Sequence, residues 1–374
     1  MKRRVRILAY FFIIVLAIFI FNMPIIISLA KWQIRSVFKD SKVLIGSCIW
    51  QPLTSLTFSD LEIKKEPVYD FKFRQLKIFY TLPTLIKSII PKIYLIDAKI
   101  DINIPQKSFL EFTRFLNLKS KNTFLPNAIE LSNLNIDLNS SDLTLRADIS
   151  SDFSLMEPQI DYLELRIETL SIHDFHLKDA YLRVRQMQPL EDFYIKQIRY
   201  GKVRIGEIKG KVELKSKVLS VDSFSGNLLQ VTLQGDLRVM TEKNPEYNIN
   251  LKFQNLDLQG LVNNFNLTEK FEMSGNLDGR VSLVGRGLNI SWLQGEFLLP
   301  KPGGILNIKD NQFLKTIAQN TQQPLDTVVT GYKEYHYNTG KGELALQKNN
   351  LILNVALDGE TGQRNFKITL HDFK

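Results

Sequence analysis

The sequence predicts a mainly β protein, in which one amino-terminal transmembrane helix precedes an elongated, curved antiparallel sheet of stacked hairpins with a few short helices. Three observations predict this fold class. The stretch from Ile7 to Ala30 is apolar and carries no charge. After Val43, apolar residues recur at every second position, the period of a strand with one buried face. Glycine and asparagine pairs typical of hairpin turns interrupt this alternation.

The composition favours a folded chain without metal or redox chemistry. Of 374 residues, 44% are hydrophobic and 23% are charged, a balance that excludes general disorder. A single cysteine forms no internal disulfide and no cysteine-based metal site, and four histidines leave little material for zinc or general-base chemistry. We therefore expect no enzyme activity, no cofactor and no metal.

The apolar stretch from Ile7 to Ala30 is long enough to cross a bilayer as a helix. Four basic residues precede it (Lys2, Arg3, Arg4 and Arg6), so the positive-inside rule places the amino terminus in the cytoplasm and the rest of the chain across the membrane. Residues 1–38 are thus predicted to be a cytoplasmic tip and anchor. The sequence Ser28-Leu29-Ala30 also fits a signal-peptidase site, and cleavage there would likewise export the chain.

Alternation predicts strands in many places, among them residues 71–80, 100–104, 131–138, 163–167 and 249–253. Helices are expected at residues 85–90, 107–118, 258–265 and 311–319. The pairs Gly226-Asn227, Gly235-Asp236, Gly275-Asn276, Asp278-Gly279, Asn349-Asn350 and Asp358-Gly359 are interpreted as turns.

A weak internal repeat marks the second half of the chain. Residues 210–239 and residues 340–359 each contain a strand, a polar turn, a second strand and a further glycine. Such units bury their apolar faces by stacking on one another. We therefore divide the exported part into an amino-terminal β region, residues 39–200, and a carboxy-terminal β region, residues 201–374.

The anchor and the carboxy-terminal motifs resemble the AsmA-like proteins of the Gram-negative envelope. The motifs are Gly275-Asn276-Leu277-Asp278-Gly279, Leu293-Gln294-Gly295-Glu296, Pro302-Gly303-Gly304-Ile305-Leu306 and Gly340-Lys341-Gly342-Glu343-Leu344. Their layout is most similar to the YdbH branch, whose carboxy-terminal region carries the label dicarboxylate transport. The resemblance covers the anchor and residues 200–374. It implies a hydrophobic groove in the form of a β-taco, held in the inner membrane with its bulk in the periplasm, that conducts phospholipid between the inner and outer membranes. The chain is short for that family, which makes a protein partner that extends the groove an expectation.

Strand alternation supplies the candidate lipid-binding lining of such a groove. The candidates are Phe71, Phe73, Leu214, Val231, Leu233, Leu237, Val239, Leu251, Phe253, Val281, Leu283, Leu353, Val355 and Leu357. The same residues would also fill a closed β-sandwich core, in which case the protein is a non-transporting scaffold for envelope assembly. Alternation alone does not separate the two.

Other motifs favour ordinary structural interpretations. The pair His173 and His176 has a spacing that can bind metal, but no third ligand lies near it in the sequence. We therefore interpret the pair as part of a solvated turn. Cys48 lies in a sequence like a lipoprotein box but far beyond the apolar stretch, which argues against lipidation. Four of the nine net positive charges precede the predicted span, and the aromatic residues follow strand alternation, so we expect no nucleic acid partner.

Overall fold

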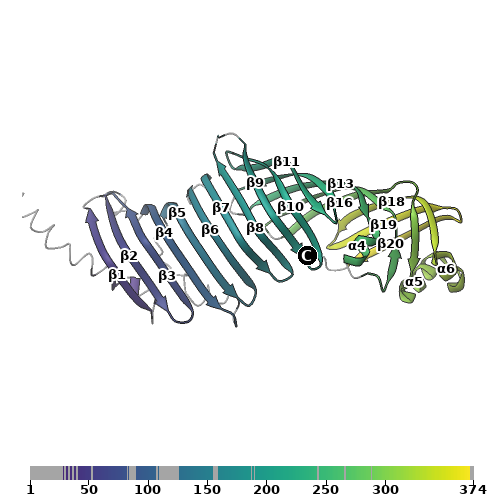
Figure 1. Ribbon diagram of the computed structural model, residues 1–374, viewed down its shortest axis with the longest axis horizontal. Helices are drawn as coiled ribbons and strands as arrows, with labels where there is room; N and C mark the ends of the chain where they lie inside the picture. The colour runs from purple at the N-terminus through teal and green to yellow at the C-terminus, as the bar shows by residue number, and fades with distance from the viewer. Residues whose placement is uncertain are drawn as a thin grey trace, which may run out of the picture. The chain divides into compact units, whose positions relative to one another are not determined.

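The chain folds into two compact units, residues 1–157 and residues 158–374. This computed structural model (Figure 1) describes residues 28, 31–32, 34–35, 38, 41–51, 54–81, 83, 90–106, 108, 126–154, 159–186, 188, 190–241, 244–264, 267–287 and 289–370. The predicted span at residues 7–30 lies outside these residues except for Ser28. The described part is mainly β, as the alternation predicts.

The first unit is an open sheet in which neighbours in the sequence are neighbours in space. Its described strands are β1 (Lys42–Gln51), β2 (Ser55–Lys65), β3 (Tyr69–Phe79), β4 (Ile90–Ile104), β5 (Pro126–Ser140) and β6 (Leu143–Ser154). All of these pairs are antiparallel except β4 and β5, which are parallel and flank the long connection at residues 105–125. Parallel neighbours require such a crossover connection, whereas antiparallel neighbours need only a tight turn.

The second unit continues the hairpin pattern with β7 to β13. These strands are β7 (Gln159–Ile172), β8 (Phe175–Arg185), β9 (Glu191–Tyr200), β10 (Val203–Lys215), β11 (Val218–Leu228), β12 (Val231–Met240) and β13 (Glu246–Asp257). Turns at residues 173–174, 201–202 and 229–230 follow one another at a constant interval along one margin of the sheet. The sheet is therefore built from a repeated hairpin, in keeping with the internal repeat.

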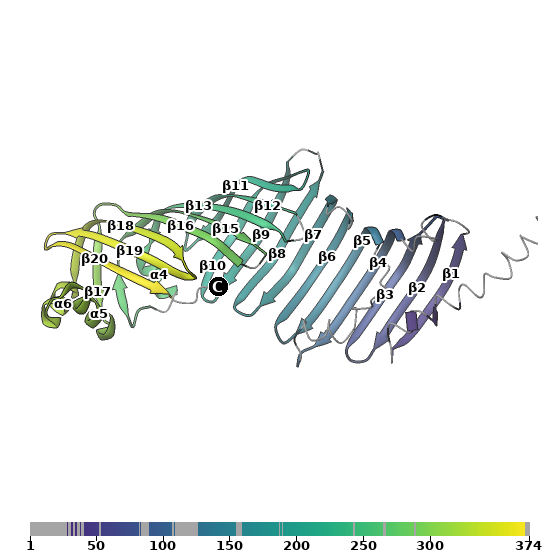
Figure 2. The ribbon, with the colours of Figure 1, turned by 180° about the vertical axis from the view of Figure 1, so that it is seen from behind.

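Beyond β13 the chain adds five more strands to the sheet and builds a cap. The five are β15 (Asn276–Arg286), β16 (Asn289–Leu299), β18 (Tyr335–Gln347), β19 (Asn350–Gly359) and β20 (Gly362–Leu370). The cap contains β14 (Phe271–Met273), β17 (Gly304–Ile308), α4 (Leu258–Asn264), α5 (Asn311–Thr321) and α6 (Leu325–Tyr332). In Figure 2, α5 and α6 lie together beside β17 and β20.

The cap closes one end of the sheet over a true hydrophobic core. Leu314 and Ile317 of α5 and Val328 of α6 are buried against Leu299 and Leu357 of the sheet. α5 begins at an Asp310 N-cap, whose carboxylate accepts hydrogen bonds from the Gln312 and Phe313 amides at 2.8 and 3.1 Å. Arg364 on β20 donates to the Gly331 carbonyl near the end of α6 and lies over the rings of Tyr332 and Tyr335. These contacts attach the helices to the sheet.

Aligned β-bulges keep the apolar side chains on one face. In β5, Asn133 has φ of 59° and the register to β6 shifts between Leu131 and Leu134. The extra residue turns the later apolar residues back to the face that Leu131 occupies, and it bends the strand. Asp60 in β2 and Asp97 in β4 are left-handed at the same level, and Asp97 accepts hydrogen bonds from Arg74 and Asn133, both at 2.9 Å. In the second unit, Asp179 in β8 and Glu207 in β10 are likewise left-handed, and the register of β10 to β11 shifts between Gly206 and Lys209.

Glycines within the strands make room for aromatic rings of neighbouring strands. A Cβ atom at Gly279 of β15 would lie 2.6 Å from atoms of both Phe253 and Phe297, and one at Gly235 of β12 would lie 2.6 Å from Phe224. Each glycine thus accepts a ring across its backbone, a pairing that compensates for the missing side chain. The prediction of turns at Gly226-Asn227, Gly235-Asp236 and Asp278-Gly279 is therefore wrong, because these pairs lie inside β11, β12 and β15.

Other local predictions have mixed outcomes. The helices expected at 258–265 and 311–319 are confirmed as α4 and α5, and the turn at Asn349 is confirmed between β18 and β19. Asp358-Gly359 ends β19, and the turn consists of the next two residues, 360 and 361. The expected helix at 85–90 ends at Ile90, which instead begins β4, and its other residues, like most of 107–118, lie outside the described part.

The predicted boundary between residues 39–200 and residues 201–374 falls within a hairpin of the structure. The hairpin of β9 and β10 crosses it, with Tyr200 directly opposite Val203, whereas the two compact units divide between Glu157 and Pro158.

Candidate functional site

The candidate site is an apolar face that runs across the sheet of the second unit. Residues directly opposite each other on paired strands share a face, so the register defines transverse rows. One row is Leu233, Phe253, Gly279, Phe297, Gly342, Val355 and Phe366, and the next is Gly235, Leu251, Val281, Gly295, Leu344, Leu353 and Ile368. A third contains Leu237 and Leu283, joined through Ile249. Val239 and Val231 lie on the same face of β12.

Leu214 extends this face toward the start of the unit. It is paired with Leu219 and belongs to a small buried cluster with Val184, Val212 and Val221, against which Leu237 packs. The register thus brings together, on one face of one unit, all the proposed lining residues from Leu214 to Leu357.

Phe71 and Phe73 belong to the first unit. Phe71 is stacked on Tyr69 with ring centroids 4.8 Å apart, and Phe38 lies edge-on to both rings. Phe71 is consequently buried, while Phe73 is partly buried in the same cluster. At this position the apolar face of the first unit is covered by its own chain.

The apolar face of the second unit differs in exposure along its length. Leu357 is 1% exposed beneath the cap, and Val355 is packed against the same core. Farther from the cap, Leu251, Val281, Leu283 and Leu353 are only partly buried, although all point to the same face. Among the described residues, the second unit is an open sheet with two buried clusters, a large one beneath the cap and a smaller one around Val212 and Leu214. The sequence left a closed sandwich and an open face as alternatives, and the sheet is open.

The opposite face is polar and carries salt bridges. Arg280 lies opposite Glu296 with Nη2 2.6 Å from Oε2, and Arg286 Nη2 lies 2.7 Å from Glu246 Oε2. These pairs are exposed, so each contributes at most about 1 kcal/mol. One face of the sheet therefore carries solvated charged side chains, whereas the other face carries apolar side chains.

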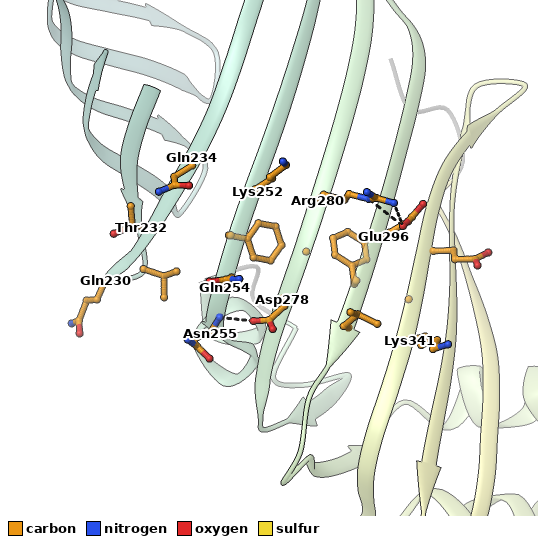
Figure 3. A pocket seen from close by; sticks show the side chains of 17 residues that line it. Gln230, Thr232, Gln234, Lys252, Gln254, Asn255, Asp278, Arg280, Glu296 and Lys341 are labelled. Atoms are coloured by element: carbon orange, nitrogen blue, oxygen red, sulfur yellow. Dashed lines mark hydrogen bonds and ion pairs between the residues drawn. The ribbon is translucent and has the colours of Figure 1, made fainter. Parts of the chain in front are cut away.

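A polar hollow of about 1100 Å³ crosses five strands of the second unit (Figure 3). Two rows of mainly polar side chains line it, on either side of a third lining row that consists of Phe253, Gly279, Phe297 and Gly342. The first row is Gln234, Lys252, Arg280, Glu296 and Glu343; the second includes Thr232, Gln254, Asp278, Leu298 and Lys341. Cations and carboxylates are balanced along these rows, so the hollow does not select a ligand of one charge.

Burial perturbs some titratable groups in the described part. The Tyr337 hydroxyl donates to the Ser274 carbonyl at 2.6 Å, and burial raises the pKa of Tyr337 to about 12. Burial also raises the pKa of the Cys48 thiol, which makes it less reactive at neutral pH. His173 occupies the turn between β7 and β8, and His176 Nδ1 lies 2.8 Å from Ser171 Oγ. Within the residues described, no cluster of histidine, cysteine and carboxylate side chains has the arrangement of a metal site.

Sequence reasoning missed two features of the site. The α6 segment was not predicted, although Leu325, Val328, Val329 and Tyr332 have helical spacing. The Gly–aromatic pairs were read as turns, because a glycine that faces a ring on another strand looks the same in sequence as a glycine in a hairpin loop.

The fold and the face define a class: an open, bulged antiparallel sheet with one apolar face, capped at one end. Comparison of the chain with protein-family models, curated proteins and solved structures finds no match. Among the described residues, no helix combines the length and apolar character that a membrane crossing requires.

Proposed function

We propose that this protein is an inner-membrane-anchored periplasmic protein that holds phospholipid acyl chains on its open apolar face and takes part in phospholipid transport between the inner and outer membranes. The observation that carries the proposal is the apolar face of the second unit, much of which stays partly exposed beyond the cap. Leu214 and Leu233 are the members of the proposed lining that are buried there, at 1% and 4% exposed. The sequence resemblance to AsmA-like proteins and the apolar stretch at residues 7–30 supply the location.

The physical basis is the transfer of acyl chains from water to an apolar surface. Each methylene that leaves water contributes about 0.8 kcal/mol, so contact along several strands stabilises a bound chain without any polar contact. The rows around Leu251, Val281 and Leu353 offer such a surface. A headgroup would remain in water at the margin of the sheet. A partner that pairs with the edge of β20 opposite β19, which no other described strand occupies, would extend the face.

Site-specific photo-crosslinking tests the proposal with a control one residue away. A benzophenone amino acid is placed at Val281, on the apolar face, or at Ser282, which points to the opposite face of the same strand. After illumination of the full chain in cells, mass spectrometry of the purified protein identifies adducts. We expect phospholipid adducts at position 281 and few at position 282. Equal labelling of both positions, or none at either, would refute acyl-chain binding on this face.

A scaffold for envelope assembly is the second candidate, and the cap favours it. The closed core beneath α5 and α6 gives a stable end to the unit, independent of any cargo. A scaffold would capture one protein reproducibly at position 281 and no phospholipid. The same crosslinking experiment therefore separates the two functions.

A further inference from the structure

Two neighbouring turns of the second unit form one continuous tip. The turn between β7 and β8 consists of His173 and Asp174, and the turn between β9 and β10 consists of Gly201 and Lys202. The Gly201 amide donates to the Asp174 carbonyl at 3.1 Å, so the two turns are joined by a hydrogen bond. We call residues 171–176 and 199–204 the hairpin tip.

Three cationic or protonatable side chains lie in one row at this tip. His176 on β8 is directly opposite Arg199 on β9, which is directly opposite Arg204 on β10. Like charges in directly opposed positions destabilise a sheet, so the pair of arginines has an unfavourable arrangement unless an anion lies between them. Within the described residues no ion pair involves Arg199 or Arg204, and Asp174 is the one carboxylate among the residues of the tip.

The other face of the same tip presents apolar side chains to solvent. Tyr200 is 65% exposed and Ile172 is 41% exposed. A tyrosine beside arginine and lysine is favoured at a membrane surface, because the ring inserts into the interfacial region while the cations bind headgroup phosphates.

We propose that the hairpin tip binds the surface of a membrane that contains anionic phospholipid. The opposed arginines, with Lys202 in the turn, supply the attraction to phosphate, and Tyr200 and Ile172 supply apolar contact at the interface. Nucleic acid fits less well, because the cations form one short row and Tyr200 is the single exposed aromatic side chain of the tip. This contact is separate from acyl-chain binding on the apolar face and does not depend on it.

Vesicle capture by the full chain tests the inference. The protein is immobilised on beads, and fluorescent vesicles are added. The vesicles consist of phosphatidylcholine, either alone or with about 30% phosphatidylglycerol, which gives a negative surface potential. We expect capture of the anionic vesicles, weakened by salt. The double variant R199Q/R204Q loses two charges at the surface and should bind them roughly 30-fold more weakly.

Matched variants identify the cause of any loss. K209Q/K252Q removes the same charge from exposed positions on β10 and β13 outside the tip and should leave capture unchanged. R199K/R204K keeps the charge and should restore most of the binding, whereas Y200S should weaken it at unchanged charge. Circular dichroism confirms that each variant is folded.

Three outcomes would overturn the proposal: equal capture of neutral and anionic vesicles, an equal loss in K209Q/K252Q, or binding of inorganic phosphate or an RNA oligonucleotide without vesicle capture. None of them bears on crosslinking at position 281, so this proposal and the proposed function fail separately.

Discussion

Leu353 and Leu357 offer a direct comparison of the open face with the capped core. They lie on the same strand, β19, and point to the same face, but Leu357 is 1% exposed beneath the cap while Leu353 is partly buried beyond it. Truncating a leucine to alanine in an enclosed core removes the transfer free energy of three carbon atoms and leaves a cavity, at a total cost of about 3 to 4 kcal/mol. On an open face no enclosed cavity forms and part of the side chain is already in water, so we expect about 1 kcal/mol.

The two substitutions should have the opposite order in lipid binding. Leu357→Ala removes a side chain that the cap hides from any ligand, whereas Leu353→Ala removes part of the proposed acyl-chain surface. Urea unfolding measures the stabilities, followed by fluorescence of Trp292, the tryptophan of the second unit. Lipid that copurifies with each variant, quantified by mass spectrometry, measures the binding.

Equal losses of stability at positions 353 and 357 would contradict the interpretation, because they would mean that Leu353 is enclosed in the protein in solution. Unchanged lipid content in Leu353→Ala, with a loss in Leu357→Ala, would place any ligand under the cap and not on the open face. The two variants are compared only if their urea m-values equal that of the unaltered protein, because a changed m-value would mean that the substitution had altered the surface exposed on unfolding.

Two further predictions concern the architecture around this face. Gly279→Ala should destabilise the second unit by about 1 to 3 kcal/mol, because the new methyl group collides with the Phe253 and Phe297 rings. Gly206→Ala is the control: its Cβ atom would make an ordinary 3.6 Å contact, so it should cost less than about 1 kcal/mol. Urea unfolding measures both free energies. Stability should also fall as the pH rises from about 10 to about 12, because the pKa of Tyr337 is raised from 10.0 to about 12 in the folded chain, so the unfolded state loses its proton first. Tyr337→Phe should flatten that part of the pH profile, and an unchanged profile would show that Tyr337 titrates alike in both states.

The strands could be predicted from sequence because each has one wet and one apolar face, which imposes a period of two. The bulge in β5 left a trace that the interpretation as plain alternation overlooked: Leu131, Leu134, Ile136 and Leu138 contain one step of three residues among steps of two. An unbulged strand would send Leu131 to the opposite face from the other three, so the step of three itself implies an inserted residue. Asn133, which tolerates the left-handed conformation, lies within that step.

The cap and the Gly–aromatic pairs depend on residues far apart in the chain, and local patterns therefore did not predict them. Gly279 is a strand residue because of Phe253 and Phe297, which are contributed by two other strands. Arg364 is likewise a charged residue opposite the apolar Leu357. Its place there is explained by α6, whose Gly331 carbonyl accepts a hydrogen bond from Arg364 and whose Tyr332 ring lies beneath the guanidinium. Such positions are determined by tertiary contacts, and a single sequence carries no local trace of the partner.

The bulges and the glycines together explain how a long sheet can keep an apolar face without closing on itself. A flat sheet of alternating strands would bury that face by packing against a second sheet. In this chain each bulge bends its strand at one level, so the bends align across neighbouring strands. The glycines meanwhile let rings such as Phe253 and Phe297 lie across the backbone, which covers bare main chain with the protein's own side chains. The face is thereby partly shielded, which reduces the cost of leaving it open, and its remaining apolar surface is the part that the proposed function assigns to acyl chains.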